Sequence, residues 1–318
     1  MNKKITLYYF LIALIVIISI TDSSHAALVS AKLDVDKALA FWTPERIKSA
    51  KPLTFEKTGF RNKTTSGTKN VKIRADNGQQ RLSMPPFDNP NNPSNYPVGR
   101  LLFSDPQTGD PGACTASVIN TENGNIGITA AHCLFNDNGI VFSNMVFSPG
   151  YNFGTPGPLG LIPVEFITVP SEYTGDPYDD PIYDYGFMRM EFNDPSGYKL
   201  QQYTGAYGWR LDVGGDSIVT YIFGYPNGGD MPNCPRDGFH LCVFVGHAKT
   251  SETIYDIHGV DLGFGASGAP LMVGYIINRN LGYLYSNYAT YFQENNQSEG
   301  PRYDPNEFNF LLEYVSNN

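Results

Sequence analysis

From residue 97 onward the chain alternates short apolar runs with clusters of Gly, Pro, Asn and Asp. The runs read VGRLLF, ASVI, NIGITAA, MVFS, LIPVEFITV, YGFMRMEF, SIVTYIFGY, LCVFVGHA and APLMVGYII. Short strands with such frequent turns predict an all-β fold, a sandwich or a barrel. No helical pattern alternates with them, which argues against a parallel α/β sheet. The last run, FNFLLEYVSNN, fits either a strand or a terminal helix.

The first 26 residues have the pattern of a secretory signal. Two lysines precede an apolar run at 5–20, and Ser24 and Ala26 occupy the small-residue positions of a cleavage site. The alternative is an uncleaved anchor. We expect cleavage after Ala26 and secretion of the product to an extracellular or periplasmic space. No second span follows in the sequence, so we expect no stable membrane association afterwards.

Residues 27–96 lack the succession of short apolar runs seen after residue 97, and we expect them to form a pro-segment or N-terminal arm. Within 27–50 the apolar residues form one rough helical stripe, with Pro44 as a breaker. A polar, basic stretch follows at 61–83, and then the linker-like MPPFDNPNNPSNYP. The main domain is therefore expected at 97–318.

Composition narrows the function classes. The chain has 318 residues, 14 % aromatic residues and a formal net charge of −9. This is enough apolar material for one large domain or two packed halves. The acidic balance argues against a nucleic-acid partner, which would require a basic face. Export implies an oxidising environment, so the four cysteines predict two disulfides.

The stretch IGITAAHC places His132 at the end of an apolar strand beside Cys133. Alone, such a histidine is more often a core residue satisfied by a backbone carbonyl. Cys114 lies 18 residues before His132, in GACTASVI. In an exported protein, Cys114 and Cys133 can tie adjacent strands together and hold the histidine loop. A side chain that abstracts a proton needs such fixed placement.

Two further segments carry candidate chemistry. In GFGASGAP, glycines bracket Ser267, and the amides of Gly265 and Ser267 could bind a developing oxyanion. The alternative is an ordinary glycine-rich turn. In YDYGFMRM, Asp184 stands at the mouth of an apolar strand, where a carboxylate could orient an imidazole. Asp179 and Asp180 compete for this role, but they lie in a Pro-rich turn that favours Asp for its own reasons.

Together these motifs resemble the chymotrypsin-like serine peptidases. CTASVI, ITAAHC, DYGFMRM and GASGAP carry the resemblance, with histidine, aspartate and serine in that order at separations of 52 and 83 residues. VGRLLF, TGAYGW and FGYP are similar to the secreted bacterial branch that includes the glutamyl endopeptidases. The resemblance implies two antiparallel Greek-key β-barrels, about 97–203 and 204–318, with the site between them.

The resemblance also implies a role for each residue. Ser267 would attack the scissile carbonyl, His132 would carry its proton to the leaving amine, and Asp184 would hold the imidazole tautomer. The Gly265 and Ser267 amides would form the oxyanion hole. The implied protein is a monomeric endopeptidase that acts on protein or peptide substrates and needs no metal or cofactor. An inactive binding module on the same fold is the alternative. An α/β-hydrolase esterase is disfavoured because its serine precedes its histidine.

Activation departs from the trypsin pattern at one position. Ala266 stands where trypsins have the aspartate that binds the new N-terminal amine. The glutamyl endopeptidase branch also lacks that aspartate. We therefore expect a zymogen whose arm, residues 27 to about 95, is cut away, with Arg81 as one candidate cleavage point.

Specificity rests on Asp261, six residues before Ser267. In trypsins an aspartate there lies at the base of the specificity pocket and selects Arg or Lys. The glutamyl endopeptidase branch instead uses a histidine on a later strand, and no histidine follows His258 in this chain. The sequence therefore argues against glutamate preference and leaves basic preference open.

The stretch CPRDGFHLCVFVGH offers a competing site. Cys234, His240, Cys242 and His247 are zinc-ligand types, but Cys-x7-Cys is wider than a usual zinc knuckle. We expect a Cys234–Cys242 disulfide instead, because export favours it. Asp and Asn residues at 172–184 lack the regular ligand spacing of a calcium loop.

Overall fold

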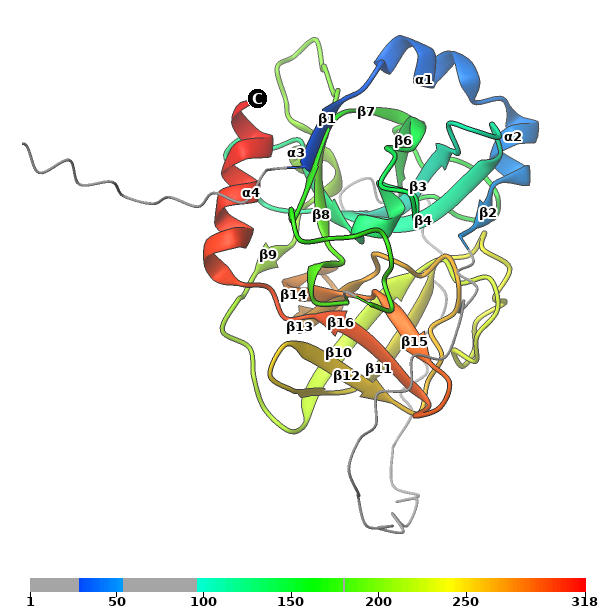
Figure 1. The fold of residues 1–318 in the computed structure, drawn as a ribbon. Helices are drawn as coiled ribbons and strands as arrows, with labels where there is room; N and C mark the ends of the chain where they lie inside the picture. Colours follow the sequence, from blue (N-terminus) through cyan, green and yellow to red (C-terminus); the bar gives the residue numbers. More distant parts are fainter. Residues whose placement is uncertain (1–28, 54–95, 180) are drawn as a thin grey trace, which may run out of the picture.

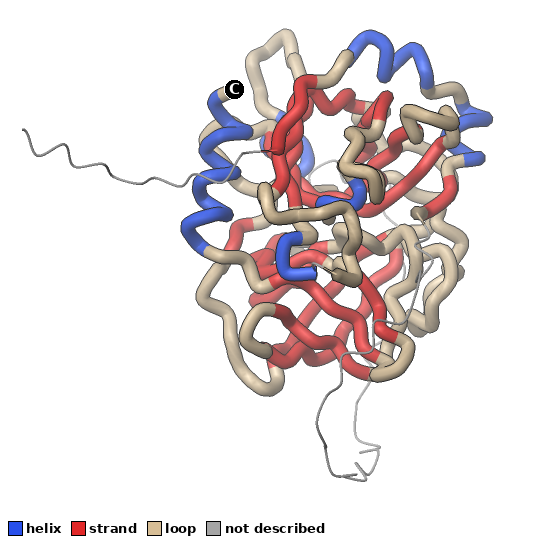
Figure 2. The backbone as a smooth tube through the Cα atoms, in the orientation of Figure 1, coloured by secondary structure: helices blue, strands red, loops and turns tan. Residues whose placement is uncertain are grey.

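The structure is a computed structural model that describes residues 29–53, 96–179 and 181–318. The expected signal peptide, most of the expected linker and the candidate cleavage point Arg81 lie outside the described residues. Among the described residues, none of the helices has both the length and the apolar character needed to cross a membrane. The fold has two parts, which Figure 1 shows one above the other and Figure 2 shows as mostly strand and loop.

The first part is a closed antiparallel barrel of six strands. They are β3 (Val98–Ser104), β4 (Pro111–Val118), β5 (Ile126–Thr129), β6 (Ser143–Pro149), β7 (Ile162–Val169) and β8 (Gly186–Met190). The order β7-β6-β3-β4-β5-β8 is closed by pairing of β8 with β7. Closure removes the free edges that an open sheet would leave.

The second part is a sheet built on later strands, antiparallel except that its edge strand β9 runs parallel to β14. They are β9 (Gly208–Trp209), β10 (Ile218–Gly224), β11 (Cys242–Thr250), β12 (Ile254–His258), β13 (Pro270–Ile276), β14 (Leu281–Asn287), β15 (Thr290–Phe292) and β16 (Gln297–Pro301). The order is β15-β16-β12-β11-β10-β13-β14-β9. Ser286 Oγ on β14 donates to the Pro301 carbonyl of β16 at 2.8 Å, so distant strands of the sheet come together.

The apolar runs of the sequence become the cores of these two parts. In β5 every residue is buried, and in β8 all but Arg189 are buried. The burial of consecutive residues agrees with the near-continuous apolar runs in the sequence, whereas a half-exposed strand would alternate apolar and polar residues. The prediction of an all-β fold is confirmed.

The C-terminal run is a helix, α4 (Pro305–Asn317), rather than a strand. Its N-cap is Asp304, whose side chain accepts from the amides of Asn306 and Glu307. Phe308, Leu311 and Val315 form its buried face, and Arg189 Nη1 of β8 donates to the Val315 carbonyl at 2.9 Å. The helix thus packs on the first barrel. A short helix, α3 (Leu200–Thr204), precedes the second sheet.

Residues 29–53, here called the N-terminal segment, are built onto the first barrel. They form β1 (Val29–Lys32), α1 (Val35–Phe41), α2 (Pro44–Ser49) and β2 (Lys51–Pro52). β1 adds antiparallel to β7, and β2 runs parallel to β4. The expectation of one helical stripe across this region is wrong, because its first residues extend the sheet.

A buried arginine ties this segment to the barrel. Arg100 of β3 is 2 % exposed. Its Nη2 donates to the Ala50 carbonyl at 2.7 Å, and its Nη1 donates to the Tyr151 hydroxyl at 2.9 Å. Nη1 also lies 3.5 Å from the Ile47 carbonyl. Burial lowers the pKa of Arg100, and no carboxylate pairs with it among the described residues. The carbonyls at the end of α2 therefore stabilise this buried charge.

Candidate active site

His132 lies on a single 3-10 turn, Ala131–Cys133, directly after β5. The buried strand carries the ring to the junction of the two sheets, and the residue is 1 % exposed. Its backbone amide donates to Asp184 Oδ1 at 2.9 Å, and its Nδ1 lies 2.7 Å from Asp184 Oδ2. Since a carboxylate accepts, Nδ1 carries the proton, and in the neutral ring Nε2 is then the basic nitrogen.

Asp184 is fully buried in the loop between the turn Pro181–Tyr183 and β8. Both carboxylate oxygens accept hydrogen bonds from His132, one from its backbone amide and one from its ring. Asp184 therefore holds the imidazole and its loop in place. The structure thus brings together Asp184 and His132, which lie 52 residues apart. Asp180, one of its competitors, lies outside the described residues.

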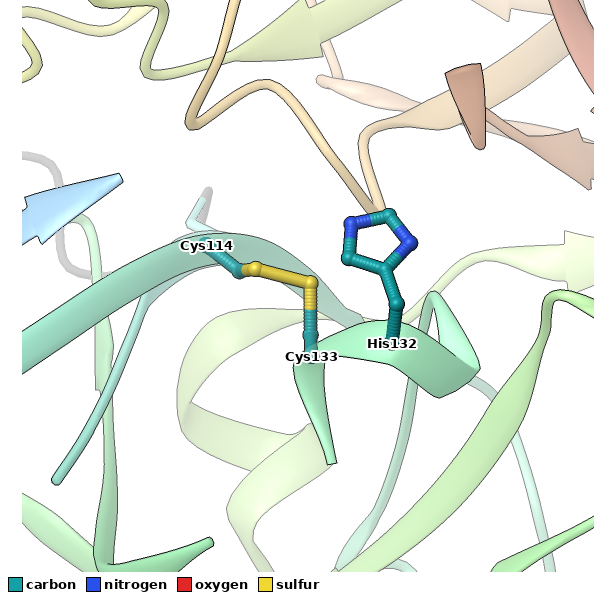
Figure 3. A group of neighbouring side chains, drawn as sticks. All are labelled: Cys114, His132 and Cys133. Carbon is teal, nitrogen blue, oxygen red and sulfur yellow. A yellow bond between two sulfur atoms is a disulfide. The ribbon is translucent and has the colours of Figure 1, made fainter. Parts of the chain in front are cut away.

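A disulfide anchors the histidine turn from the other side. Cys114 of β4 and Cys133 are joined, as the sequence predicted. Figure 3 shows the bond beside the His132 ring. Ligand atoms of Cys114, His132 and Cys133 lie within 4.8 Å of one another, a spacing that would suit a metal. Because both sulfurs are in the disulfide, neither is a thiolate that could bind one.

Ser267 lies on the loop between β12 and β13 and is 8 % exposed. Its carbonyl accepts from the Thr115 amide of β4 at 2.9 Å. The next residue, Gly268, has a φ of +82°, and a Cβ there would overlap the Thr115 carbonyl and the Thr129 hydroxyl. Only glycine lets this loop of the second sheet press against the strands that carry His132.

Two backbone amides at the Ser267 loop have no acceptor among the described residues. Gly265 has a φ of +84°, and its carbonyl accepts from Thr115 Oγ1 at 2.8 Å. Within the described part of the chain, neither the Gly265 amide nor the Ser267 amide donates to a protein acceptor. Buried amides normally find partners, so two such donors, one on each side of Ala266, are a feature to be explained.

A small cavity of about 60 Å³ joins the candidate residues. Its lining includes His132, Ser267 and Asp261, the residue predicted for the specificity pocket. Asp261 Oδ1 accepts from the Gly263 amide at 2.9 Å. Burial raises the pKa of Asp261, the Gly263 bond opposes this, and the nearby Asp230 charge adds to it.

Several lining residues were not predicted from the sequence, and one of them comes from the N-terminal segment. Leu53, at the end of the N-terminal segment, shares the cavity with His132 and Ser267. Its neighbour Pro52 lies against Gly265, where Pro52 Cβ would be 3.3 Å from an added Cβ. No local sequence signal could reveal this contact, because the segment resembles a detached arm.

The competing zinc site does not form. Cys234 and Cys242 are joined in a disulfide, as expected, so neither thiol is free to bind zinc. His240 Nδ1 instead lies 2.7 Å from Asp237 Oδ2, within the same loop. His247 lies on β11, in the strand that follows.

Solved structures with the same arrangement of strands are serine proteases. A thermostable serine protease, AL20, from an extremophilic microorganism matches with a TM-score of 0.58 and 22 % identity, over 72 % of this chain and 100 % of that one. The protease Anisep from Arthrobacter nicotinovorans matches with a TM-score of 0.53 and 24 % identity, over 66 % and 90 %. A Glu endopeptidase matches with a TM-score of 0.54 and 15 % identity, over 73 % and 96 %.

No protein-family model and no curated protein matches the chain. The structural matches nevertheless show that the chain has the fold of the chymotrypsin-like serine proteases, as the sequence motifs predicted. The predicted all-β, chymotrypsin-like fold class is confirmed with them, as one closed barrel and a second sheet. At these identities the likeness concerns the fold, and the chemistry has to be argued from the site.

Proposed function

We propose that the protein is a serine endopeptidase with Ser267, His132 and Asp184 as its catalytic triad. The observation that carries this proposal is the buried Asp184–His132 pair, whose His132 lines the same cavity as Ser267. An isolated core histidine would be satisfied by a carbonyl. Here a carboxylate that accepts two hydrogen bonds from His132 instead stabilises the imidazolium that forms when His132 accepts a proton.

The proposed reaction has two halves. Ser267 Oγ bonds to the scissile carbonyl carbon while its proton moves to His132 Nε2. The carbon–nitrogen bond then breaks, His132 gives the proton to the leaving amine, and an acyl-enzyme remains. Water then attacks the ester while His132 Nε2 takes its proton, and His132 gives that proton to Ser267 Oγ as the acyl carbon–oxygen bond breaks, which releases the acid product. The amides of Gly265 and Ser267 would donate to the oxyanion in both halves.

For specificity we propose a preference for Arg or Lys, with Asp261 as the selecting residue. Support comes from its position on the cavity wall and from its raised pKa. Asp261 is half-buried, and a partly desolvated carboxylate gains from a cationic partner such as a substrate ammonium or guanidinium. Matched Arg, Glu and Phe substrates test this, and Asp261→Ser should remove any advantage of Arg.

We further propose that the enzyme is secreted and latent when synthesised. Signal cleavage after Ala26 and two disulfides fit export. Latency is supported by Leu53, which lies in the cleft, and by the cavity volume of about 60 Å³, against the ~300–1,000 Å³ usual for ligand sites. Activation would cut the chain within 54–95, where Arg81 is the candidate.

The experiment is digestion of a denatured protein by processed wild type and by Ser267→Ala. The proposal expects cuts by the wild type alone, with products read by mass spectrometry. Equal cutting by both would assign the activity to a contaminant. No cutting by either, in correctly processed and folded protein, would favour the alternative of a non-catalytic binding module on the same fold.

A further inference from the structure

Asp184 is held through its backbone as well as through its carboxylate. Asn287, the last residue of β14, is fully buried, and its Nδ2 donates to the Asp184 carbonyl at 3.0 Å. A longer contact of 3.4 Å joins the same nitrogen to the Tyr288 carbonyl. Asn287 belongs to the second sheet and Asp184 to the loop before β8 of the first barrel, so the bond crosses between the two parts.

The orientation of the Asn287 amide is set by Tyr303. The Tyr303 hydroxyl donates to Asn287 Oδ1 at 2.7 Å. Tyr303 is 3 % exposed, and its burial raises its pKa, so the hydroxyl keeps its proton and remains a donor. Its ring packs on Tyr185 at 4.7 Å and on Phe308 of α4 at 5.0 Å. With Oδ1 occupied by a donor, Nδ2 must face the Asp184 carbonyl.

Tyr288, which directly follows Asn287 at the end of β14, is hydrogen-bonded to the two residues after Ser267. Gly268 donates to the Tyr288 carbonyl at 2.8 Å, and Tyr288 donates to the Ala269 carbonyl at 2.8 Å. Asn287 itself pairs with Pro270 in the sheet register. A continuous path of hydrogen bonds therefore runs from the Ser267 loop through Asn287 to Asp184, and from Asp184 to His132.

We propose that Asn287 is a positioning residue that aligns the Asp184–His132 pair with Ser267, and that Tyr303 fixes its amide. This inference rests on the proposed peptidase function. Ser267 and His132 come from different halves of the fold, so their separation depends on how the halves meet. A buried bond from one half to the acid of the other fixes that geometry, and displacement by about 1 Å can cost about 100-fold in rate.

The test compares Asn287→Ala and Tyr303→Phe with a matched control, Tyr285→Phe. Tyr285 is also a buried tyrosine, on β14, and its hydroxyl bonds to Thr220 Oγ1 at 2.6 Å, away from Asp184. We expect kcat of Asn287→Ala to fall roughly 10- to 100-fold with KM within about twofold. Tyr303→Phe should show a smaller loss of the same kind, and Tyr285→Phe almost none.

The pH profile separates positioning from general stability. If Asp184 shifts away from His132, the imidazolium is less stabilised, so the acid limb of kcat/KM should move to lower pH in Asn287→Ala and Tyr303→Phe. Unchanged kcat and pH profiles in both variants would overturn the inference, whatever their melting temperatures. If Asn287→Ala does not fold, Tyr303→Phe decides alone. Absence of hydrolysis by the wild type would instead refute the proposed function.

Discussion

The buried Arg100 offers a prediction whose size can be worked out from its contacts. Arg100→Met removes the guanidinium but keeps most of the apolar stem volume. Two charge-assisted bonds are lost, to the Ala50 carbonyl and to the Tyr151 hydroxyl. The Ala50 carbonyl then loses its buried partner. The substitution leaves no buried charge behind, and a neutral buried acceptor without a partner typically costs about 1–3 kcal/mol, so we expect a value in that range.

A matched control is available on α2. Arg46 also donates to a backbone carbonyl, that of Phe41 at 2.6 Å, and its guanidinium lies 4.2 Å from the Phe41 ring centre. It differs from Arg100 in being exposed. Because water replaces such contacts, Arg46→Met should cost less than about 1 kcal/mol.

The assay is urea denaturation of both variants in a Ser267→Ala background, which prevents self-digestion. In a parallel thermal melt of a domain of this size, about 1–3 kcal/mol corresponds to a fall of roughly 2–12 °C in melting temperature. Hydrogen exchange should also quicken over α2 and β2, since Arg100 binds the end of α2. Equal losses for Arg100→Met and Arg46→Met, or a loss below about 1 kcal/mol for Arg100→Met, would refute this reasoning.

Three further predictions follow from the site and the second sheet. Asp184→Asn keeps the shape but favours the wrong His132 tautomer, so kcat should fall about 10⁴-fold while substrate binding changes little, as steady-state kinetics would show. Asp261→Ser should abolish any preference for Arg over Phe substrates, and an unchanged ratio would remove Asp261 from the specificity role. Burial and the Asp256 charge raise the pKa of Glu299 to about 7. The folded state therefore holds a proton that the unfolded state releases near pH 4.5, and stability falls as pH rises from about 4.5 through 7. Melting temperatures at pH 5 and 8 should show a smaller fall for Glu299→Gln than for the wild type.

The sequence predicted the fold class because the short apolar runs and their turns are local signals. Runs such as NIGITAA and YGFMRMEF became β5 and β8, and the barrel requires both. The candidate site was also predictable, because His132, Asp184 and Ser267 each lie in a short motif of recognisable chemistry. Their meeting in space follows from the fold that those motifs share with known proteases.

What the sequence could not predict depends on contacts between distant segments. Arg100 reads as a surface residue in VGRLLF, yet it is buried because α2 covers it. Leu53 reads as part of a detached arm, yet β2 brings it to the cleft. Asn287 lies in LYSNYA without any motif, and its role appears only where two halves of the fold meet. No periodicity or composition encodes such partners.

The integration of the N-terminal segment changes the expectation for maturation. The sequence suggested removal of the whole arm, residues 27 to about 95. Loss of residues 29–53 would uncover Arg100 and leave its charge without the α2 carbonyls. We therefore propose that a cut within 54–95 frees the cleft from Leu53 while α1 and α2 stay bound. Mass spectrometry of purified active enzyme should find both chains together.

The most direct test of the account is covalent labelling of Ser267. A fluorophosphonate probe forms a bond to an activated serine Oγ, and peptide mapping locates the modified residue. In processed protein the account predicts one label, at Ser267, that is lost in Ser267→Ala and strongly reduced in His132→Ala. A folded, processed protein that takes no label, or takes it equally in His132→Ala, would contradict the proposed triad.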